Sequence, residues 1–322
     1  SGRLDTLTRN VVSSGGHFRV HYDASGYNAP SIADGDMNGI PAYIDSTLVY
    51  LEYAWNLEIN VLGFKAPSDD NGAGGGDEID VYVRNFGTSG YGITYPETQA
   101  DKSVSAYMQI DNDYKESQYS AKGYAALRVT TAHEFMHVIQ FSYKIDSTVL
   151  IWWMEHVGTW MEERAWDDVN DYLAYLKNFY LYQNKYPIDH ISYGDNFMYG
   201  AVVWPIYLSK RFGDGIIRNL WNTIIADRNF SIASFDRVIP GGLGAALNEF
   251  GIWNYFTAGR ADSDKFLPDA AQFLDTVATD ASVLDWPAEN NLSTVNLSSN
   301  YIECFFAGAW GTRDAIRVDY TA

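Results

Sequence analysis

Five residues near the middle of the chain, His133 to His137, have the sequence HEFMH and fit the pattern H-E-x-x-H. Residues four apart share one face of a helix, so His133 and His137 can present two imidazoles to one metal ion. Glu134 then lies beside the metal, where its carboxylate can take a proton from a bound water. Zinc suits these ligands, so the segment predicts a catalytic zinc site. The alternative is a helix with two ordinary surface histidines.

A zinc site of this kind requires a third ligand. The continuation HEFMHVIQFSY excludes the metzincin pattern HExxHxxGxxH. The next segment, WWMEHVGTWMEE at 152–163, predicts a second helix, and Glu155 follows His137 after 17 intervening residues. Glu155 is the predicted third ligand, and His156, Glu162 and Glu163 are the alternatives. Without a metal, the segment would be an amphipathic helix with core tryptophans and solvated acids.

The two segments together resemble the gluzincin pattern, in which a glutamate on a downstream helix completes a His-His-Glu site. The run MEHVGTW is similar to the NEGFASW segment of zinc aminopeptidases, which places Glu155 on the ligand glutamate. A longer series, from FRVHY through DEIDVYV and SAYMQIDNDY to DVNDYLAYL, resembles a family of largely uncharacterised bacterial secreted zinc peptidases over most of residues 17–260. This resemblance implies a thermolysin-like catalytic core and an extracellular location.

The sequence departs from these relatives in three ways. The spacing to Glu155 is one residue shorter than is common in aminopeptidases. Thr159 stands where thermolysin-type enzymes often have an aspartate, so we expect Asp111, Asp113 or Glu162 to support a ligand histidine instead. No GAMEN-like exopeptidase signature is present, which favours an endopeptidase.

Amide hydrolysis places negative charge on the carbonyl oxygen, so a hydrogen-bond donor opposite the metal lowers the barrier. In DNFMYGAVVW, Tyr199 precedes a Gly-Ala pair and resembles the transition-state tyrosine in the YxKGA segment of aminopeptidases. Tyr193 and His190 are further candidates, and the alternative is a core tyrosine. Asp195 resembles the aspartate ligand of aspzincins and is a second possibility for the third ligand.

Gluzincins also place an edge strand before the zinc helix, and an unpaired edge can bind a peptide by strand addition. The β-prone run VSAYMQI, residues 104–110, precedes the zinc segment. The resemblance therefore implies that 104–110 is a substrate-binding edge strand.

The segment DGDMNGIPAYID, residues 34–45, fits the spacing of a calcium-binding loop. Its expected ligands are the side chains of Asp34, Asp36, Asn38 and Asp45 and the carbonyl of Ile40. The alternative is a turn that caps the helix that follows. A looser second candidate for calcium covers residues 68–80.

The patterns predict an α+β fold with a strand-rich N-terminal part at 1–145, a helical part at 146–280, and a β-rich tail or the start of a further module at 281–322. Period-two runs predict strands at 17–22, 77–83 and 104–110, and apolar residues three or four apart predict a helix from Ile44 to Trp55. Helices are further expected at 152–166, 169–182, 197–211 and 216–228, with a kink at Pro205.

Composition narrows the classes of partner. The formal net charge is −19, from 41 acidic and 22 basic residues, which argues against nucleic acid. Cys304 is the only cysteine, so an intrachain disulfide and a site of several thiolates are excluded. The sequence contains no run of 18 apolar residues, so no membrane span is predicted. We also expect a monomer.

These features together predict zinc-dependent hydrolysis of peptide bonds in a protein or peptide substrate. Two alternatives remain open. One is a catalytically inactive protein that keeps the fold and binds a partner. The other is a zinc hydrolase of a non-peptide amide or ester.

Overall fold

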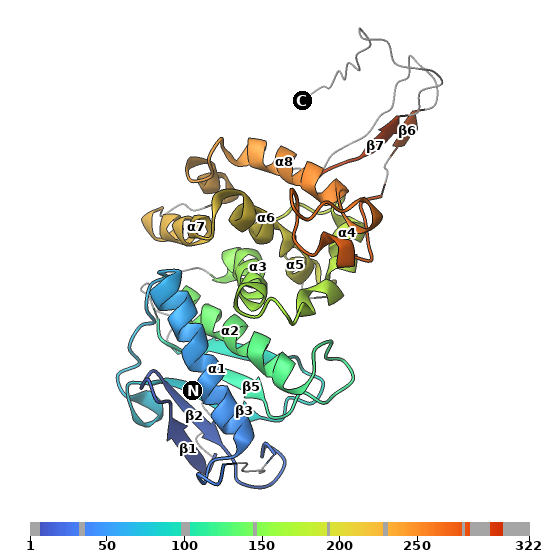
Figure 1. Cartoon of the computed structure of the whole chain (residues 1–322). Helices are drawn as coiled ribbons and strands as arrows, with labels where there is room; N and C mark the ends of the chain where they lie inside the picture. Colours follow the sequence, from blue (N-terminus) through green and yellow to red (C-terminus); the bar gives the residue numbers. More distant parts are fainter. Residues whose placement is uncertain are drawn as a thin grey trace.

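The computed structural model describes residues 7–31, 36–97, 104–143, 147–191, 194–227, 231–278, 281–283 and 297–304. In sequence order, a sheet with two helices is followed by a set of helices and a small strand pair (Figure 1). This arrangement confirms the predicted α+β class. The predicted boundaries at residues 145 and 280 both fall in stretches outside the described residues.

The main sheet has five strands in the order β1-β2-β3-β5-β4. The strands are β1 (Arg9–Val12), β2 (Phe18–Tyr22), β3 (Ile79–Arg84), β4 (Gly92–Pro96) and β5 (Ala106–Asp111). β2, β3 and β5 run parallel, and the two edge strands β1 and β4 run antiparallel to their neighbours. The predicted strands at 17–22, 77–83 and 104–110 are confirmed, whereas the sequence patterns did not predict β1 or β4.

The prediction that 104–110 forms the edge strand is wrong. β5 is hydrogen-bonded on both sides, to β3 and to β4, and all six of its residues are buried. A strand that is buried on both faces belongs in the interior of a sheet. β4 is the edge strand on this side, and its residues are only partly buried or exposed.

Helices α1 (Ala42–Trp55) and α2 (Gly123–Phe141) lie against the sheet (Figure 1). The predicted helix from Ile44 to Trp55 is confirmed, and it continues as a π-helical turn over Asn56–Val61. α2 contacts β4 and β5 and also packs against α3 (Ser147–Ala165). Phe135 of α2 packs against the rings of Phe18 and Trp55. The helix that carries HEFMH is thus held between the sheet and the helical part.

The helical part continues beyond α3 with short helices. They are the 3₁₀ turn Asp171–Ala174, α4 (Leu176–Tyr182), α5 (Phe197–Gly200), α6 (Val203–Phe212), α7 (Gly215–Ala226), the 3₁₀ helix Ile232–Arg237, α8 (Leu243–Tyr255), and the 3₁₀ turns Ala258–Arg260 and Ala270–Gln272. The predicted helices at 152–166 and 216–228 correspond to α3 and α7. The predicted helix at 169–182 is present only as the turn at 171–174 and α4.

The predicted helix at 197–211 is divided into α5 and α6 at Ala201 and Val202 rather than kinked at Pro205. A proline ring clashes with the carbonyl four residues before it, which here is that of Ala201, but is tolerated in the first turn of a helix. Pro205 is the third residue of α6. The proline therefore accounts for a break four residues earlier than the predicted position.

Near the C-terminus, β6 (Ala281–Val283) and β7 (Ile302–Cys304) form a parallel pair (Figure 1). Both strands lie within the predicted β-rich tail at 281–322, of which only residues 281–283 and 297–304 are described, so the tail as a whole stays a prediction. Within the described part of the chain, no helix is both long and apolar enough to cross a membrane.

Candidate metal centre

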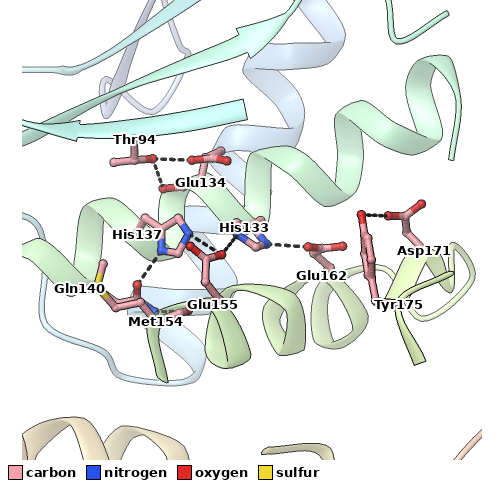
Figure 2. A network of polar contacts seen from close by, with 10 residues as sticks. All are labelled: Thr94, His133, Glu134, His137, Gln140, Met154, Glu155, Glu162, Asp171 and Tyr175. Carbon is pink, nitrogen blue, oxygen red and sulfur yellow. Dashed lines mark hydrogen bonds and ion pairs between the residues drawn. The ribbon is translucent and has the colours of Figure 1, made fainter. Parts of the chain in front are cut away.

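His133 and His137 of α2 and Glu155 of α3 point toward one another across the contact between the two helices (Figure 2). Oε2 of Glu155 lies 3.4 Å from Nε2 of His133 and 3.6 Å from Nε2 of His137. All three ligand atoms lie within 4.8 Å of one another. The three side chains predicted as metal ligands therefore form one cluster that could hold a metal ion.

The spacing of these atoms can be compared with that required by a metal ion. Zinc lies about 2.0–2.2 Å from imidazole nitrogen and carboxylate oxygen, and its usual geometry is tetrahedral. Two ligand atoms at that distance and angle are about 3.3–3.6 Å apart, by simple trigonometry on the same bond lengths. The observed distances of 3.4 and 3.6 Å agree with this value. The donor set of two nitrogens and one oxygen also suits zinc.

The second nitrogen of each imidazole is held by a neighbouring side chain (Figure 2). Nδ1 of His133 lies 2.6 Å from Oε1 of Glu162, and Nδ1 of His137 lies 2.7 Å from Oε1 of Gln140. Gln140 in turn donates its amide to the carbonyl of Met154 at 3.1 Å. These contacts direct Nε2 of both histidines toward Glu155 and fix the ring orientations, as supporting groups do around metal-bound histidines.

Glu162 thus fills the supporting role for which the sequence offered three candidates, and Asp111 and Asp113 do not. Oxygens of Asp111 accept the backbone amides of Phe86, Asp113 and Tyr114 at 2.7–2.9 Å. Asp113 forms an ion pair with Lys115 at 3.0 Å. Both aspartates therefore stabilise the chain after β5 rather than a ligand histidine. The position of Asp111 and Asp113 before the zinc helix did not reveal this role. In a turn directly after a strand, such side chains bind the backbone of the turn itself.

One face of α3 is shaped to receive His133. Glu155, Gly158 and Glu162 follow one another at helical spacings of three and four. A Cβ atom added to Gly158 would lie 2.9 Å from Cε1 and Nε2 of His133, closer than any ordinary contact. The glycine in WWMEHVGTW therefore provides the space in which the imidazole sits.

The cluster also has unusual electrostatics. Burial lowers the pKa of His133, but hydrogen bonds and negative charge from Glu155 and Glu162 outweigh it, so the pKa is raised well above its ordinary value. Burial also lowers the pKa of His137, but the negative charge of Glu155 outweighs it, so this pKa is raised as well. Burial raises the pKa of Glu155, but the two histidines outweigh it and lower the pKa. A metal ion would replace these protons as the positive charge beside Glu155.

Glu134 lies next to this cluster and is almost completely buried. Burial raises the pKa of its carboxyl, and the nearby histidines and Thr94 oppose this increase. The hydroxyl of Thr94 on β4 lies 2.7 Å from Oε2 and 3.0 Å from the backbone oxygen of Glu134 (Figure 2). A Cβ on Gly92 would lie 2.8 Å from the Glu134 side chain. The edge strand therefore both positions this carboxyl and leaves room for it.

A cavity of about 270 Å³ opens beside His133 and Glu134. The predicted residue Tyr199 lines it, together with residues that sequence reasoning missed, Tyr91, Asp171, Tyr175 and Asn196. The hydroxyls of Tyr91 and Tyr175 contact the carboxylate of Asp171 at 3.0 and 3.3 Å. Tyr91 lies in the loop before β4, and Asp171 and Tyr175 lie in and directly after the 3₁₀ turn 171–174. The sequence pattern predicted a continuous helix at 169–182, and it did not indicate that these side chains face the cavity.

The other candidates do not reach the cluster. Asp195 and His190 contact each other at 3.2 Å, and neither lines the cavity. His156 is fully buried, and burial lowers its pKa to about 3, so it is neutral. Glu163 belongs to a separate acidic group with Asp167 and Asp269. Tyr193 lies outside the described residues.

The predicted calcium loop is described from Asp36 onward, and Asp34 lies outside the described residues. The amide of Asn38 donates to Asp36 and Asp45 at 3.2–3.3 Å, and the backbone amide of Ile40 donates to Oδ1 of Asn38 at 2.7 Å. The turn of the alternative interpretation is present, because Asp36 and Asn38 accept the backbone amides of Asn38 and Ile40, but it does not cap α1, which begins after Pro41 without a side-chain cap. Calcium binding by this loop stays a prediction. In the looser candidate, Asp69 and Asp70 accept backbone amides of their own turn.

No protein-family model matches the chain, and no curated protein matches it.

Proposed function

We propose that this chain is a zinc-dependent peptidase, and specifically an endopeptidase with a thermolysin-like core. The observation that carries the proposal is the cluster of His133, His137 and Glu155 beside the buried carboxyl of Glu134, in which Glu155 lies at the distance from both histidine nitrogens that a tetrahedral zinc site requires. The order of sheet, zinc helix and second helix with a glutamate supports the thermolysin-like core. We also propose that the protein acts outside the cell, as the sequence resemblance implies.

The bound metal would supply a Lewis acid that polarises the scissile carbonyl and acidifies water. The chain's own residues would carry the proton transfers. Glu134 takes a proton from the attacking water and passes it to the leaving amine. Its raised pKa suits this task, because a base whose pKa lies nearer to the working pH can both accept and return a proton. Glu162 and Gln140 keep the two imidazoles oriented throughout.

The edge strand β4 supports a peptide as the substrate. Its partner on one side is β5, and no other described strand pairs with its second edge. An extended peptide can add to such an edge through main-chain hydrogen bonds. Thr94, in the middle of β4, contacts Glu134 directly. A peptide bound along this strand would therefore pass close to the base and the metal ligands.

Tyr199 is the proposed hydrogen-bond donor to the developing oxyanion. It lines the cavity that also contains His133 and Glu134, and its ring packs against that of Tyr175 at 5.4 Å.

The test is hydrolysis of an unfolded protein such as casein by the zinc-loaded chain and by Glu134→Gln. Glutamine preserves the shape of the side chain and the contact with Thr94 but cannot accept a proton. We expect Glu134→Gln to retain one zinc per chain and to lose hydrolysis by at least about a hundredfold. Hydrolysis at the wild-type rate by this variant would refute the assigned base. Failure of the zinc-loaded wild type to cleave any peptide bond would refute the proposed peptidase activity.

A further inference from the structure

A second group of carboxylates lies in the helical part of the molecule. Glu163 near the end of α3, Asp167 in the turn after it and Asp269 in the 267–272 segment offer oxygens that all lie within 4.8 Å of one another. Glu163 and Asp167 are four residues apart, and Asp269 approaches from about a hundred residues away in the chain. Three acids held this close repel one another unless a proton or a cation lies between them.

The basic side chains nearby are already engaged. Arg164 forms an ion pair with Asp214 at 2.7 Å, and the ammonium of Lys210 donates to the carbonyl of Ser263. In the described part of the chain, none of the three acids forms an ion pair with a lysine, arginine or histidine. The charge of Lys210 opposes the raised pKa of Asp269 but does not cancel it.

A buried hydroxyl points to a ligand at this group. Tyr172 is only 1% exposed, and its hydroxyl has no hydrogen-bond partner among the described residues. Burial raises its pKa, and the negative charges of Glu163, Asp269 and Asp167 raise it further, so the hydroxyl lies within electrostatic range of the three acids. A buried hydroxyl without a partner costs about 1–3 kcal/mol. One oxygen of Glu163 is also buried without a partner.

The group is accessible from solvent. Glu163, Asp167 and Pro268, which precedes Asp269, line a groove of about 430 Å³. A small cation could enter from this groove with part of its water shell. Oxygen donors without nitrogen or sulfur are the ligands of calcium, which accepts six to eight oxygens in irregular geometry. Magnesium requires a stricter octahedron and fits an irregular cluster less well.

We propose that Glu163, Asp167 and Asp269 bind a calcium ion, with the Tyr172 hydroxyl bonded to a water in the ion's shell. The ion would join the C-terminal end of α3, the helix that carries Glu155, to the 267–272 segment. This site is separate from both the zinc cluster and the loop at 34–45, and it does not depend on the proposed catalytic function.

The test is calorimetric titration of the zinc-loaded full chain with CaCl₂ in calcium-free buffer. Asp269→Asn and Glu163→Gln remove ligand charges, and Asp264→Asn is the matched control because it removes an exposed charge from the preceding turn. Asp45→Asn reports on the other predicted loop. We expect Asp269→Asn and Glu163→Gln each to lose one calcium per chain, or to bind it at least about tenfold more weakly. Asp264→Asn should match the wild type, and Asp45→Asn should keep the Glu163-dependent ion.

A second readout protects the test against a folding defect. Calcium should raise the melting temperature of the wild type in a concentration-dependent way, and this increase should be smaller in Glu163→Gln than in Asp264→Asn. The proposal is overturned if the wild type binds no calcium. It is also overturned if Glu163→Gln and Asp269→Asn bind calcium with wild-type number and affinity, since the acids would then share a proton. Should Asp269→Asn fail to fold, Glu163→Gln decides alone.

Discussion

Gly158 offers the sharpest test of how α3 shapes the metal cluster. In the sequence it is an ordinary helical glycine, and helix propensity alone predicts that Gly158→Ala stabilises the chain by about 1 kcal/mol. The structure predicts a different effect. The new Cβ would lie 2.9 Å from both Cε1 and Nε2 of His133 and 3.2 Å from Cδ2.

The size of the effect follows from these distances. Carbon atoms pack at about 3.5–4.0 Å, so the imidazole would have to move by roughly 0.6 Å or more. Metal–ligand distances are held within about 0.2 Å. Glu162 resists the movement, because it holds Nδ1 of the same ring at 2.6 Å. Disturbed support of a ligand histidine costs about 10–100-fold in metal affinity, or about 1.4–2.8 kcal/mol. We therefore expect zinc binding to weaken at least tenfold.

The assay is zinc competition against a chromogenic chelator, with thermal unfolding of the metal-free proteins measured in parallel. Gly244→Ala is the matched control, because Gly244 lies in α8 and an added Cβ would meet nothing within 4 Å. We expect Gly244→Ala to bind zinc as the wild type does and to unfold at the same or a slightly higher temperature. Wild-type zinc affinity in Gly158→Ala would refute the close packing of His133 on α3.

Three further predictions follow from single contacts. Glu162→Gln should weaken zinc affinity by about 10–100-fold in the same competition assay, because a neutral amide supports His133 less well than a carboxylate; an unchanged affinity would remove Glu162 from the site. Tyr199→Phe should lower kcat by about a hundredfold with little change in KM, as loss of an oxyanion donor does, and equal rates in steady-state kinetics would count against that role. Burial raises the pKa of Glu58 well above its ordinary value, so the folded state keeps a proton that the unfolded state releases, and stability falls as the pH rises above the ordinary value. Glu58→Gln should therefore match the wild type near pH 4 and exceed it at pH 8 by about 1–3 kcal/mol in denaturant unfolding, and a pH-independent difference would contradict this.

The metal cluster could be predicted from the sequence because its geometry is helical. A spacing of four places His133 and His137 on one face of α2, and the apolar pattern around WWME placed Glu155 on a second helix. The same periodicity identified Glu162 as a neighbour of Glu155. Local periodicity thus contained nearly all the information that this cluster required.

The surroundings of the cluster depend on contacts between distant segments, which periodicity does not encode. β4 has the sequence GITYP, and with a glycine at one end and a proline at the other it gives no strong strand signal. Its place beside Glu134 follows from the strand order, in which β5 lies inside the sheet. Similarly, Tyr91, Asp171 and Tyr175 meet at the cavity only because a loop and a 3₁₀ segment are brought together by the fold.

The central claim is that α2 and α3 together hold one zinc ion, and metal analysis tests it most directly. Zinc would be measured in the purified wild type, in Glu155→Ala and in Glu249→Ala, which changes the same residue type on α8, away from the cluster. We predict one zinc per chain in the wild type and in Glu249→Ala, and loss of stoichiometric zinc in Glu155→Ala. Full retention of zinc by Glu155→Ala, or a wild type that binds no zinc, would contradict the account.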